Sequence, residues 1–313
     1  MSLVLRTMKS LSRSGKISRF DMDNLISRKQ SQRFPQLFVK KYTRRVFYDN
    51  LWHKDRSLLE ARGHVEDADG NVVIRPLTKI FNRFENSTDI DLDETCVYVR
   101  KVNGFMAAAT YVPLVDQVVV STTGSLDSDF VGIAEKYITD DVKNMIKMCG
   151  PMFTCVFEIC DPSDPHIVPE EVGAYLLAVR EVDQQSDYFS TEVDERLIDV
   201  FSKMLKVKRP EWGVAKFSDI VAMTDACKHE GYVVYGQESN TALKIKSKYY
   251  LALKAAARAR DIAKLDKTRV DEEFYDLIDY LKSIRDQFTA ADEQTRLEII
   301  REYIEAGSAM AAS

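Results

Sequence analysis

The strongest constraint on the fold is a change of pattern near Ser247. Before this residue, short apolar runs typical of strands alternate with turns and occasional helices. After it, apolar residues recur only at helical spacing, over about 65 residues with no strand pattern. We therefore expect an α+β fold with antiparallel sheets and flanking helices in residues 1–247, followed by a small all-α domain in residues 248–313. A helical tail excludes a β-barrel as the C-terminal domain.

A lysine and a glycine stand between two of the apolar runs. The motif Lys101-Val102-Asn103-Gly104 follows the run Cys96 to Val99 and precedes Phe105 to Val112. A lysine at the end of a buried strand is partly desolvated, so its amine acts as a nucleophile. The same Lys-x-x-Gly spacing begins at Lys147 and Lys228, but Lys147 closes a predicted helix and Lys228 has no apolar strand before it. Lys101 is therefore the candidate nucleophile.

Carboxylates and lysines follow Lys101 in a set order. Glu158 ends a buried strand, Glu230 opens the next Glu-Gly-Tyr-Val strand, and Lys244 and Lys246 alternate onto one face of the last strand. This order resembles the motifs of the covalent nucleotidyltransferases, which are ATP-dependent ligases and capping enzymes. The Lys-x-Asn-Gly motif and the spacing from Glu-Gly-Tyr-Val to Lys-Ile-Lys-Ser are most similar to the phage RNA ligase 1 family.

Two segments before the nucleophile carry the same resemblance. They are Glu60-Ala61-Arg62-Gly63 and the run from Arg75 to Asn86. In that family the arginine and the lysine of these segments bind ATP phosphates, so the resemblance assigns these roles to Arg62 and Lys79. It also assigns a nucleotide contact to Tyr48, within residues 44–49, which we expect to be extended. One position departs from the family, because Thr123 stands where a basic residue usually precedes Gly-Ser.

The resemblance implies a nucleotidyltransferase (adenylation) domain and an ATP-dependent RNA ligase. Such an enzyme joins 5′-phosphate and 3′-hydroxyl RNA ends through lysyl-AMP on Lys101, with a role in RNA repair. Its cofactors would be ATP and Mg²⁺, with Mn²⁺ as a substitute, and Glu230 would place the metal. Glu158 would hold the ribose hydroxyls. As cations near the α-phosphate, Lys244 and Lys246 would stabilise the transition state. The implied ATP-binding residues are Tyr48, Arg62, Lys79, Lys101, Asn103, Gly104, Glu158, Lys244 and Lys246.

Three other functions are compatible with part of this pattern. A nick-sealing DNA ligase or a guanylyltransferase would normally carry a β-barrel after the last motif, and labelling with GTP would identify the second. A non-catalytic RNA-binding protein on the same scaffold would bind RNA without ATP labelling. No Gly-x-x-x-x-Gly-Lys-Ser/Thr loop is present, which excludes a fused P-loop kinase.

Charge is distributed unevenly along this acidic chain, whose net charge is −5. Residues 1–45 carry 12 Lys and Arg against two Asp, and residues 244–269 carry nine against two, whereas residues 270–305 hold 11 acids against four bases. Basic stripes of this kind indicate a polyanion partner. We expect RNA, either as single-stranded ends or as a broken structured RNA such as tRNA, and no protein partner.

Apolar runs, cysteines and the first twenty residues indicate the cell compartment. The chain has no apolar run long enough for a membrane span, and five cysteines without a Cys-x-x-Cys pair indicate reduced thiols. We expect a cytoplasmic protein, in the host cytoplasm if the chain is viral. The Ser- and Arg-rich first twenty residues leave a mitochondrial transit peptide as a minor alternative.

Several helices are also predicted before the tail. Residues 130–148 are expected to form one helix, and residues 183–228 are expected to hold helices and loops, with 193–205 the clearest helix. After Ser247 we expect helices over residues 250–265, 271–287 and 292–306.

The first test concerns the helical tail, which we expect to be needed for RNA joining and not for adenylylation of the lysine. We expect that deleting the residues after about position 250 leaves adenylylation of the lysine measurable but damages RNA joining, because the tail carries strand-holding cations. Labelling with α-labelled ATP and gel-based strand joining would be measured on the same preparation. Equal loss of both activities would contradict this expectation.

Overall fold

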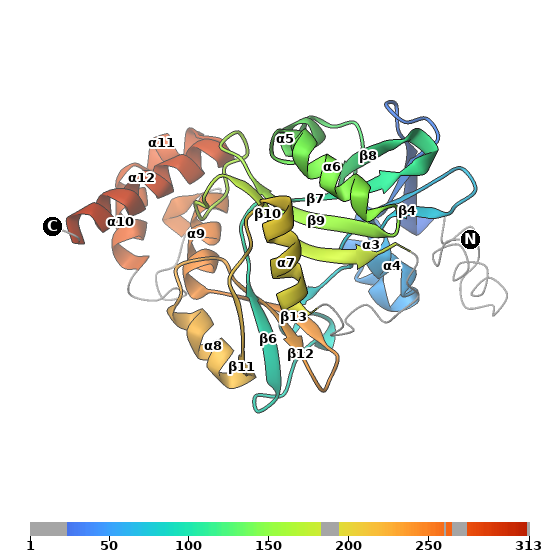
Figure 1. Ribbon diagram of the computed structural model, residues 1–313. Coiled ribbons are helices and arrows are strands. Elements are labelled where there is room, and N and C mark those ends of the chain that lie inside the picture. The colour runs from blue at the N-terminus through green and yellow to red at the C-terminus, as the bar shows by residue number, and fades with distance from the viewer. Residues whose placement is uncertain (1–23, 183–193, 260, 265–273, 312–313) are drawn as a thin grey trace. The chain divides into compact units, whose positions relative to one another are not determined.

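The computed structural model describes residues 24–182, 194–259, 261–264 and 274–311 (Figure 1). The chain forms two compact units whose segments interleave along the sequence. Unit 1 holds residues up to 80, 105–159 and 173–210, and unit 2 holds residues 81–104, 160–172 and from 211 onward. Within the described residues, no helix has the length and apolar character needed to cross a membrane.

Unit 1 contains two four-stranded sheets. The first has the order β1 (Ile26–Gln30), β2 (Phe38–Tyr42), β3 (Arg62–Glu66) and β4 (Val72–Ile74), and each neighbouring pair is antiparallel. The second has the order β10 (Gly173–Glu181), β9 (Phe153–Cys160), β7 (Phe105–Val112) and β8 (Gln117–Thr122). The helical elements of this unit are α3 (Arg44–Tyr48), η1 (Leu51–Lys54), α4 (Ser57–Glu60), η3 (Pro113–Val115), α5 (Asp129–Tyr137), α6 (Asp140–Cys149) and α7 (Glu195–Leu205).

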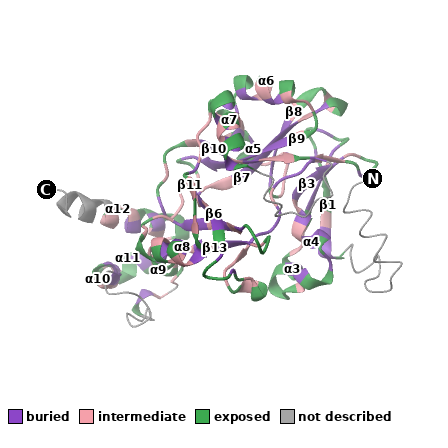
Figure 2. Ribbon diagram, turned by 60° about the horizontal axis from the view of Figure 1, so that its bottom comes forward, coloured by how far each residue is buried: buried purple, intermediate pink, exposed green. Residues whose placement is uncertain are grey.

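The second sheet of unit 1 has two chemically different faces. On β7 and β9, side chains such as Ala107 and Phe157 point to one face and pack against apolar residues of α5, α6 and α7. Figure 2 shows these strands buried, whereas the outer sides of the helices are exposed. The opposite face carries Met106 paired with Glu158, and Leu77 packs there against Met106 and Val156. The period of two along β9 therefore places Glu158 away from the helix-covered core.

Unit 2 is built on a five-stranded sheet followed by helices. The strand order is β11 (Trp212–Lys216), β6 (Thr95–Arg100), β12 (Gly231–Gly236), β13 (Ala242–Lys246) and β5 (Phe81–Asn82), and only the β13–β5 pair is parallel. The helix α8 (Phe217–Ala226) buries Phe217 and Ile220 against Tyr232 and Val234 of β12. The other helical elements are η2 (Glu85–Ser87), α9 (Lys248–Arg258), η4 (Ile262–Lys264), α10 (Tyr275–Ser283), α11 (Arg285–Ala290) and α12 (Glu293–Ala311).

The predicted α+β class with antiparallel sheets and a helical tail is confirmed. All described elements from Lys248 onward are helical, and they share one apolar cluster that includes Leu253, Leu281 and Ile300. The boundary proposed at residue 247 stays a prediction. The predicted helix over 193–205 is α7, although residue 193 lies outside the described residues, as do residues 1–23 of the basic N-terminal stretch.

Three local predictions are wrong. Residues 44–48 form the helix α3, although β-branched and aromatic residues there favour a strand, because the turn buries Val46 completely. The helix predicted over 130–148 is two helices, because Thr139 has an extended backbone and Asp140 starts a new N-terminus. Residues 212–216 form β11, although a loop is expected there because glycine weakens a strand pattern. Pairing with β6 supplies the hydrogen bonds that stabilise this strand.

A buried charged cluster surrounds His64 on β3. Lys40 contacts Glu66 at 2.6 Å, and Arg75 lies 3.5 Å from Glu60, with each of these four side chains under 10% exposed. Burial, followed by the positive charges of Arg75 and Lys40, lowers the pKa of His64 to about 3. His64 is therefore neutral in the folded protein at pH values where the unfolded chain would protonate it.

This shift predicts how stability depends on pH. Because the unfolded histidine has a pKa of 6.5 and the folded one a pKa of about 3, the free energy of unfolding should fall as pH drops through this window. One such proton changes it by about 1.4 kcal/mol per pH unit. Urea unfolding from pH 7 to about 4 should give a shallower pH dependence for His64→Gln than for wild type. The control is His53→Gln, because His53 is exposed and its loss should leave the pH dependence of the free energy of unfolding unchanged. The same pH dependence in His64→Gln as in wild type would contradict the lowered pKa of His64.

Candidate active site

Three strand ends of unit 2 meet at one edge of its sheet. Arg100, the last residue of β6, pairs with Tyr232, and Gly231, the first residue of β12, pairs with Lys246 at the end of β13. The Lys101 amide extends this ladder by donating to the Gly231 carbonyl at 2.9 Å. The antiparallel register thus places Lys101, Glu230 and Lys246 side by side.

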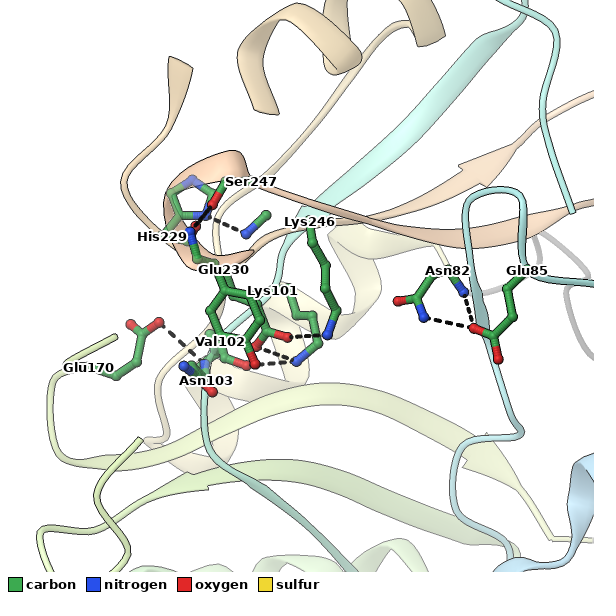
Figure 3. Close-up of polar contacts among 12 residues, drawn as sticks. Asn82, Glu85, Lys101, Val102, Asn103, Glu170, His229, Glu230, Lys246 and Ser247 are labelled. Atoms are coloured by element: carbon green, nitrogen blue, oxygen red, sulfur yellow. Dashed lines mark hydrogen bonds and ion pairs between the residues drawn. The ribbon is translucent and has the colours of Figure 1, made fainter. Parts of the chain in front are cut away.

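Glu230 binds two lysines at this edge, as Figure 3 shows. The Lys101 Nζ donates to Glu230 Oε2 at 2.8 Å, and the Lys246 Nζ lies 3.3 Å from Oε1. The Glu230 side chain is only 3% exposed, whereas those of Lys101 and Lys246 are 22% and 19% exposed. Burial of a carboxylate is costly unless cations and hydrogen bonds compensate it, so this carboxylate fixes the positions of both amines. Lys101 keeps enough exposure to reach a substrate.

Gly231 lets the chain turn tightly after Glu230. Its φ is +125°, and a Cβ at this position would lie 2.1 Å from the Ile245 carbonyl oxygen of the neighbouring strand. No side chain fits in that space, so the glycine of the Glu-Gly-Tyr-Val motif is required by backbone packing. It aims Glu230 toward the end of β6.

His229 and Ser247 brace the same turn. The Gly231 amide donates to His229 Nδ1 at 3.1 Å, and the Ser247 hydroxyl donates to the His229 carbonyl. Burial and the nearby Arg100 charge lower the pKa of His229, which keeps Nδ1 available as an acceptor. Ser247 also accepts from the Tyr250 amide, so this residue caps α9 as it fixes the turn.

Glu170 and Arg100 belong to this site, although no motif in the sequence identified them. Arg100 contacts Glu170 Oε2 at 2.8 Å, and the Asn103 amide donates to Oε1 at 3.3 Å. Burial raises the pKa of Glu170 despite Arg100, and the Glu230 charge raises it further. Glu170 precedes another acid in a loop and follows no strand, so no spacing rule could have identified it. Its contacts hold both ends of the Arg100 to Asn103 segment.

Five of the predicted site residues besides Glu230 lie in unit 2, and their roles stay predictions. Lys101 and Asn103 lie between β6 and β7, and Asn103 is buried, with no partner for its side-chain Nδ2 among the residues that the structure describes. Lys244 and Lys246 share one face of β13, because Leu243 and Ile245 alternate with them into the core under α8. Gly104 is the last residue of this unit's segment before β7.

The other predicted residues lie in unit 1. Arg62 begins β3, and Lys79 is 8% exposed with its Nζ 5.5 Å from the centre of the Trp52 ring. Glu158 is 9% exposed on the face of β9 against which Leu77 packs, so the segment leading to Lys79 runs across that face. Tyr48 is 75% exposed on α3. These positions are compatible with their predicted roles, which remain proposals.

Thr123 has a cationic neighbour that the sequence did not reveal. A Cβ at Gly63 would lie 2.8 Å from both the Thr122 carbonyl oxygen and the Thr123 Cα, so the turn at 122–124 packs directly on the chain beside Arg62. The Lys41 Nζ lies 3.2 Å from the Cβ position of Gly124. The strand β2 therefore supplies a cation at the turn where the family usually has a basic residue.

The two other Lys-x-x-Gly lysines have ordinary surroundings. Lys147 lies in the last turn of α6 and forms an exposed ion pair with Asp116 at 2.8 Å. Lys228 is exposed in the loop between α8 and β12. Neither lysine lies at the end of a buried strand, which distinguishes them from Lys101.

A divalent cation fits the donor set around Glu230. Two carboxylates, Glu230 and Glu170, lie near Lys101, and Mg²⁺ is typically bound by one or two carboxylates together with substrate phosphates and water. Among the described residues, no group of three or more His, Cys, Asp or Glu side chains could hold a metal by itself. A metal at this site would therefore depend on substrate oxygens.

Gly231 gives a direct test of the site's backbone. We expect Gly231→Ala to lower the free energy of unfolding by about 2 kcal/mol or more, because the added Cβ collides with the Ile245 carbonyl and the positive φ is strained. The matched control is Gly132→Ala in α5, where nothing lies within 4 Å of the new Cβ and a small gain is expected. Urea unfolding would compare both variants, and equal stability of the two would refute the packing argument.

Comparison with known proteins identifies the family. A family model described as RNA ligase, of the T4 RNA ligase 1 type, matches residues 60–256. A search of curated proteins found no match. One solved form of an archaeal ATP-dependent RNA ligase has a TM-score of 0.55 at 16% identity, covering 92% of this chain and 76% of its own. A putative ATP-dependent DNA ligase from Aquifex aeolicus has a TM-score of 0.51 at 16% identity, covering 97% and 76%.

The two kinds of comparison answer different questions. At such low identity the solved structures show a shared nucleotidyltransferase fold, which RNA and DNA ligases have in common. The family model spans well over half of the sequence, from before Arg62 to beyond Lys246. On this evidence the chain belongs to the RNA ligase family represented by phage RNA ligase 1, as its motifs predicted.

Proposed function

We propose that this protein is an ATP-dependent RNA ligase that joins 5′-phosphate and 3′-hydroxyl RNA ends through lysyl-AMP on Lys101. The observation that carries the proposal is the pairing of Lys101 and Lys246 with one buried carboxylate, at 2.8 and 3.3 Å. An amine at a strand end, held by hydrogen bonding and still 22% exposed, is suited to nucleophilic attack.

The first step forms a phosphoramidate bond. The Lys101 amine attacks the α-phosphorus of ATP, the bond to the β-phosphate oxygen breaks, and pyrophosphate leaves. The amine loses its protons in this step, and Glu230 Oε2, 2.8 Å away, is positioned to accept one. Lys246 and Lys244, on one face of β13, would counter the charge that develops on the α-phosphate oxygens.

The two later steps transfer AMP and join the strands. A 5′-phosphate oxygen of RNA attacks the lysyl-AMP phosphorus, which breaks the phosphoramidate bond and returns the amine to Lys101. A 3′-hydroxyl then attacks the activated 5′-phosphate, forms the phosphodiester bond and releases AMP. The same cations near the α-phosphate would serve all three steps, since each develops charge on phosphate oxygens.

We assign the metal to Glu230, with Mg²⁺ as the natural ion and Mn²⁺ as a substitute. When bound, it would withdraw charge from phosphate oxygens. Glu230 and Glu170 supply the carboxylates for this role, while Arg62, Lys79 and Lys41 of unit 1 are assigned to ATP phosphates and Glu158 to the ribose. Tyr48, Asn103 and Gly104 complete the proposed ATP-binding set.

The proposed substrate is RNA with a break, repaired either as free single-stranded ends or within a folded RNA such as tRNA. The basic helix α9 is suited to contact phosphates near Lys101, because it begins two residues after Lys246 and carries Lys254 and Arg258 on consecutive turns. Removal of Mg²⁺ by a chelator should abolish labelling, and Mn²⁺ should restore it.

The test is covalent labelling with ATP that carries label at the α-phosphate. After incubation with Mg²⁺ and denaturing electrophoresis, wild type, Lys147→Ala and Lys228→Ala should carry the label, and Lys101→Ala should carry none, because Lys101 alone of these three lysines follows a buried strand. Prior treatment with pyrophosphate removes any AMP bound during expression.

The alternatives predict different labelling. Label from GTP in place of ATP would indicate a guanylyltransferase, and joining of nicked DNA in preference to RNA would indicate a DNA ligase. A folded wild-type protein that takes no label but binds RNA would contradict the ligase function and favour a binding protein on the same scaffold.

A further inference from the structure

A pocket in unit 2 lies next to the lysine site, between α9, the loop at residues 163–167 and the start of α12. Its volume is about 320 Å³, which is within the range of small-molecule and nucleotide pockets. Asn103, two residues after the nucleophile, lies in its wall. The pocket is therefore continuous with the Lys101 segment.

Lys254 supplies the pocket with a cation that has no direct ion pair among the described residues. Each pocket carboxylate already contacts a basic side chain, since Asp164 lies 3.0 Å from His166 and Glu293 lies 3.1 Å from Arg258. Lys254 forms no ion pair with any carboxylate among the described residues. Burial, followed by the charges of Lys246 and Arg258, lowers its pKa, and the Glu230 charge offsets this shift only in part. An anion bound at Lys254 would relieve this cost.

Asn103, which lines the pocket, has a buried donor without a partner among the described residues. Asn103 is 6% exposed, and its Nδ2 has no hydrogen-bond acceptor among the described residues. Leaving a buried donor unsatisfied costs free energy, which a ligand rich in oxygen acceptors would recover. A cation without an ion pair and a residue with an unpaired amide, both in the lining of one pocket, together favour a phosphate-bearing ligand.

The ring of Tyr250 connects this pocket to the lysine site. Tyr250 is 6% exposed, and the Lys246 Nζ lies 5.0 Å from its ring centre, while the Lys254 Nζ lies 5.4 Å from it. Because Lys246 also binds Glu230, a ligand at Lys254 would be one aromatic ring away from the cluster that holds Lys101.

On these contacts, and resting on the proposed ligase function, we propose that this pocket binds the 5′-phosphorylated terminal nucleotide of RNA, with Lys254 contacting the terminal phosphate. A terminal monophosphate carries up to two negative charges and more acceptor oxygens than a 3′-hydroxyl end, which matches one lone ammonium and one unpaired amide. The site would hold the phosphate that must accept AMP from Lys101.

The experiment compares the binding of two short RNAs that differ only in a 5′-phosphate or a 5′-hydroxyl, each blocked and labelled at the 3′ end. Fluorescence anisotropy with Mg²⁺ and without ATP gives the ratio of their dissociation constants. Wild type should prefer the phosphorylated RNA by about tenfold, as expected for one charge-assisted contact, and Lys254→Gln should reduce this ratio to about one.

The matched control is Lys248→Gln on the same helix, since Lys248 is 55% exposed and does not line the pocket. It removes the same charge and should keep the preference for 5′-phosphate. Thermal melting would establish that Lys254→Gln is folded, and Lys254→Arg should retain part of the preference. The ratio, unlike the affinity itself, is insensitive to a general loss of RNA binding.

Three outcomes would overturn the proposal. They are an unchanged ratio in Lys254→Gln, the absence of a preference in wild type, and a loss of ATP labelling in Lys254→Gln that matches its loss of RNA discrimination, which would make the pocket part of the ATP site. Failure of the ligase function is recognised separately, because wild type would then take no label from ATP whatever its preference for 5′-phosphate.

Discussion

The candidate site depends on the ion pairing of the buried Glu230 carboxylate with two lysines. A carboxylate that is 3% exposed is stable only with cations around it, and Lys101 and Lys246 supply them from two different strand ends. Each lysine is held in place because the carboxylate is buried, and the carboxylate is tolerated because both lysines are present. A shift of one residue in β6 or β13 would break this arrangement and turn each side chain to the other face of the sheet.

Supporting contacts hold that carboxylate within a narrow range of positions. Gly231 permits the turn after Glu230, His229 accepts from the Gly231 amide, and Ser247 ties the turn to the start of α9. Glu170 binds Arg100 and the Asn103 amide from a separate loop. A reactive group needs such surrounding bonds, because small displacements of a nucleophile cost large factors in rate.

The two units are built from alternating segments of the chain, and Lys101, the proposed nucleophile, lies close to a point where the chain passes from one unit to the other. Gly104 ends a segment of unit 2 and Phe105 begins a segment of unit 1, so the Lys101 to Gly104 loop connects the two sheets covalently. The ligase motifs are divided in the same way: Arg62, Lys79 and Glu158 belong to unit 1, and Lys101, Glu230 and Lys246 belong to unit 2.

The sequence alone determined the α+β class, the helical tail, the family, and the strand-end position of Lys101, because these follow from local periodicity and motif order. The position of Lys244 and Lys246 on one face of a strand is also predictable from the sequence, because side chains alternate between the two faces. Only the tertiary structure brought Glu170 to the Arg100–Asn103 segment, placed Lys41 beside Gly124, and made residues 44–48 a helix. Those features depend on contacts between segments far apart in the chain, where packing and the burial of charge outweigh the local preferences that a sequence pattern records.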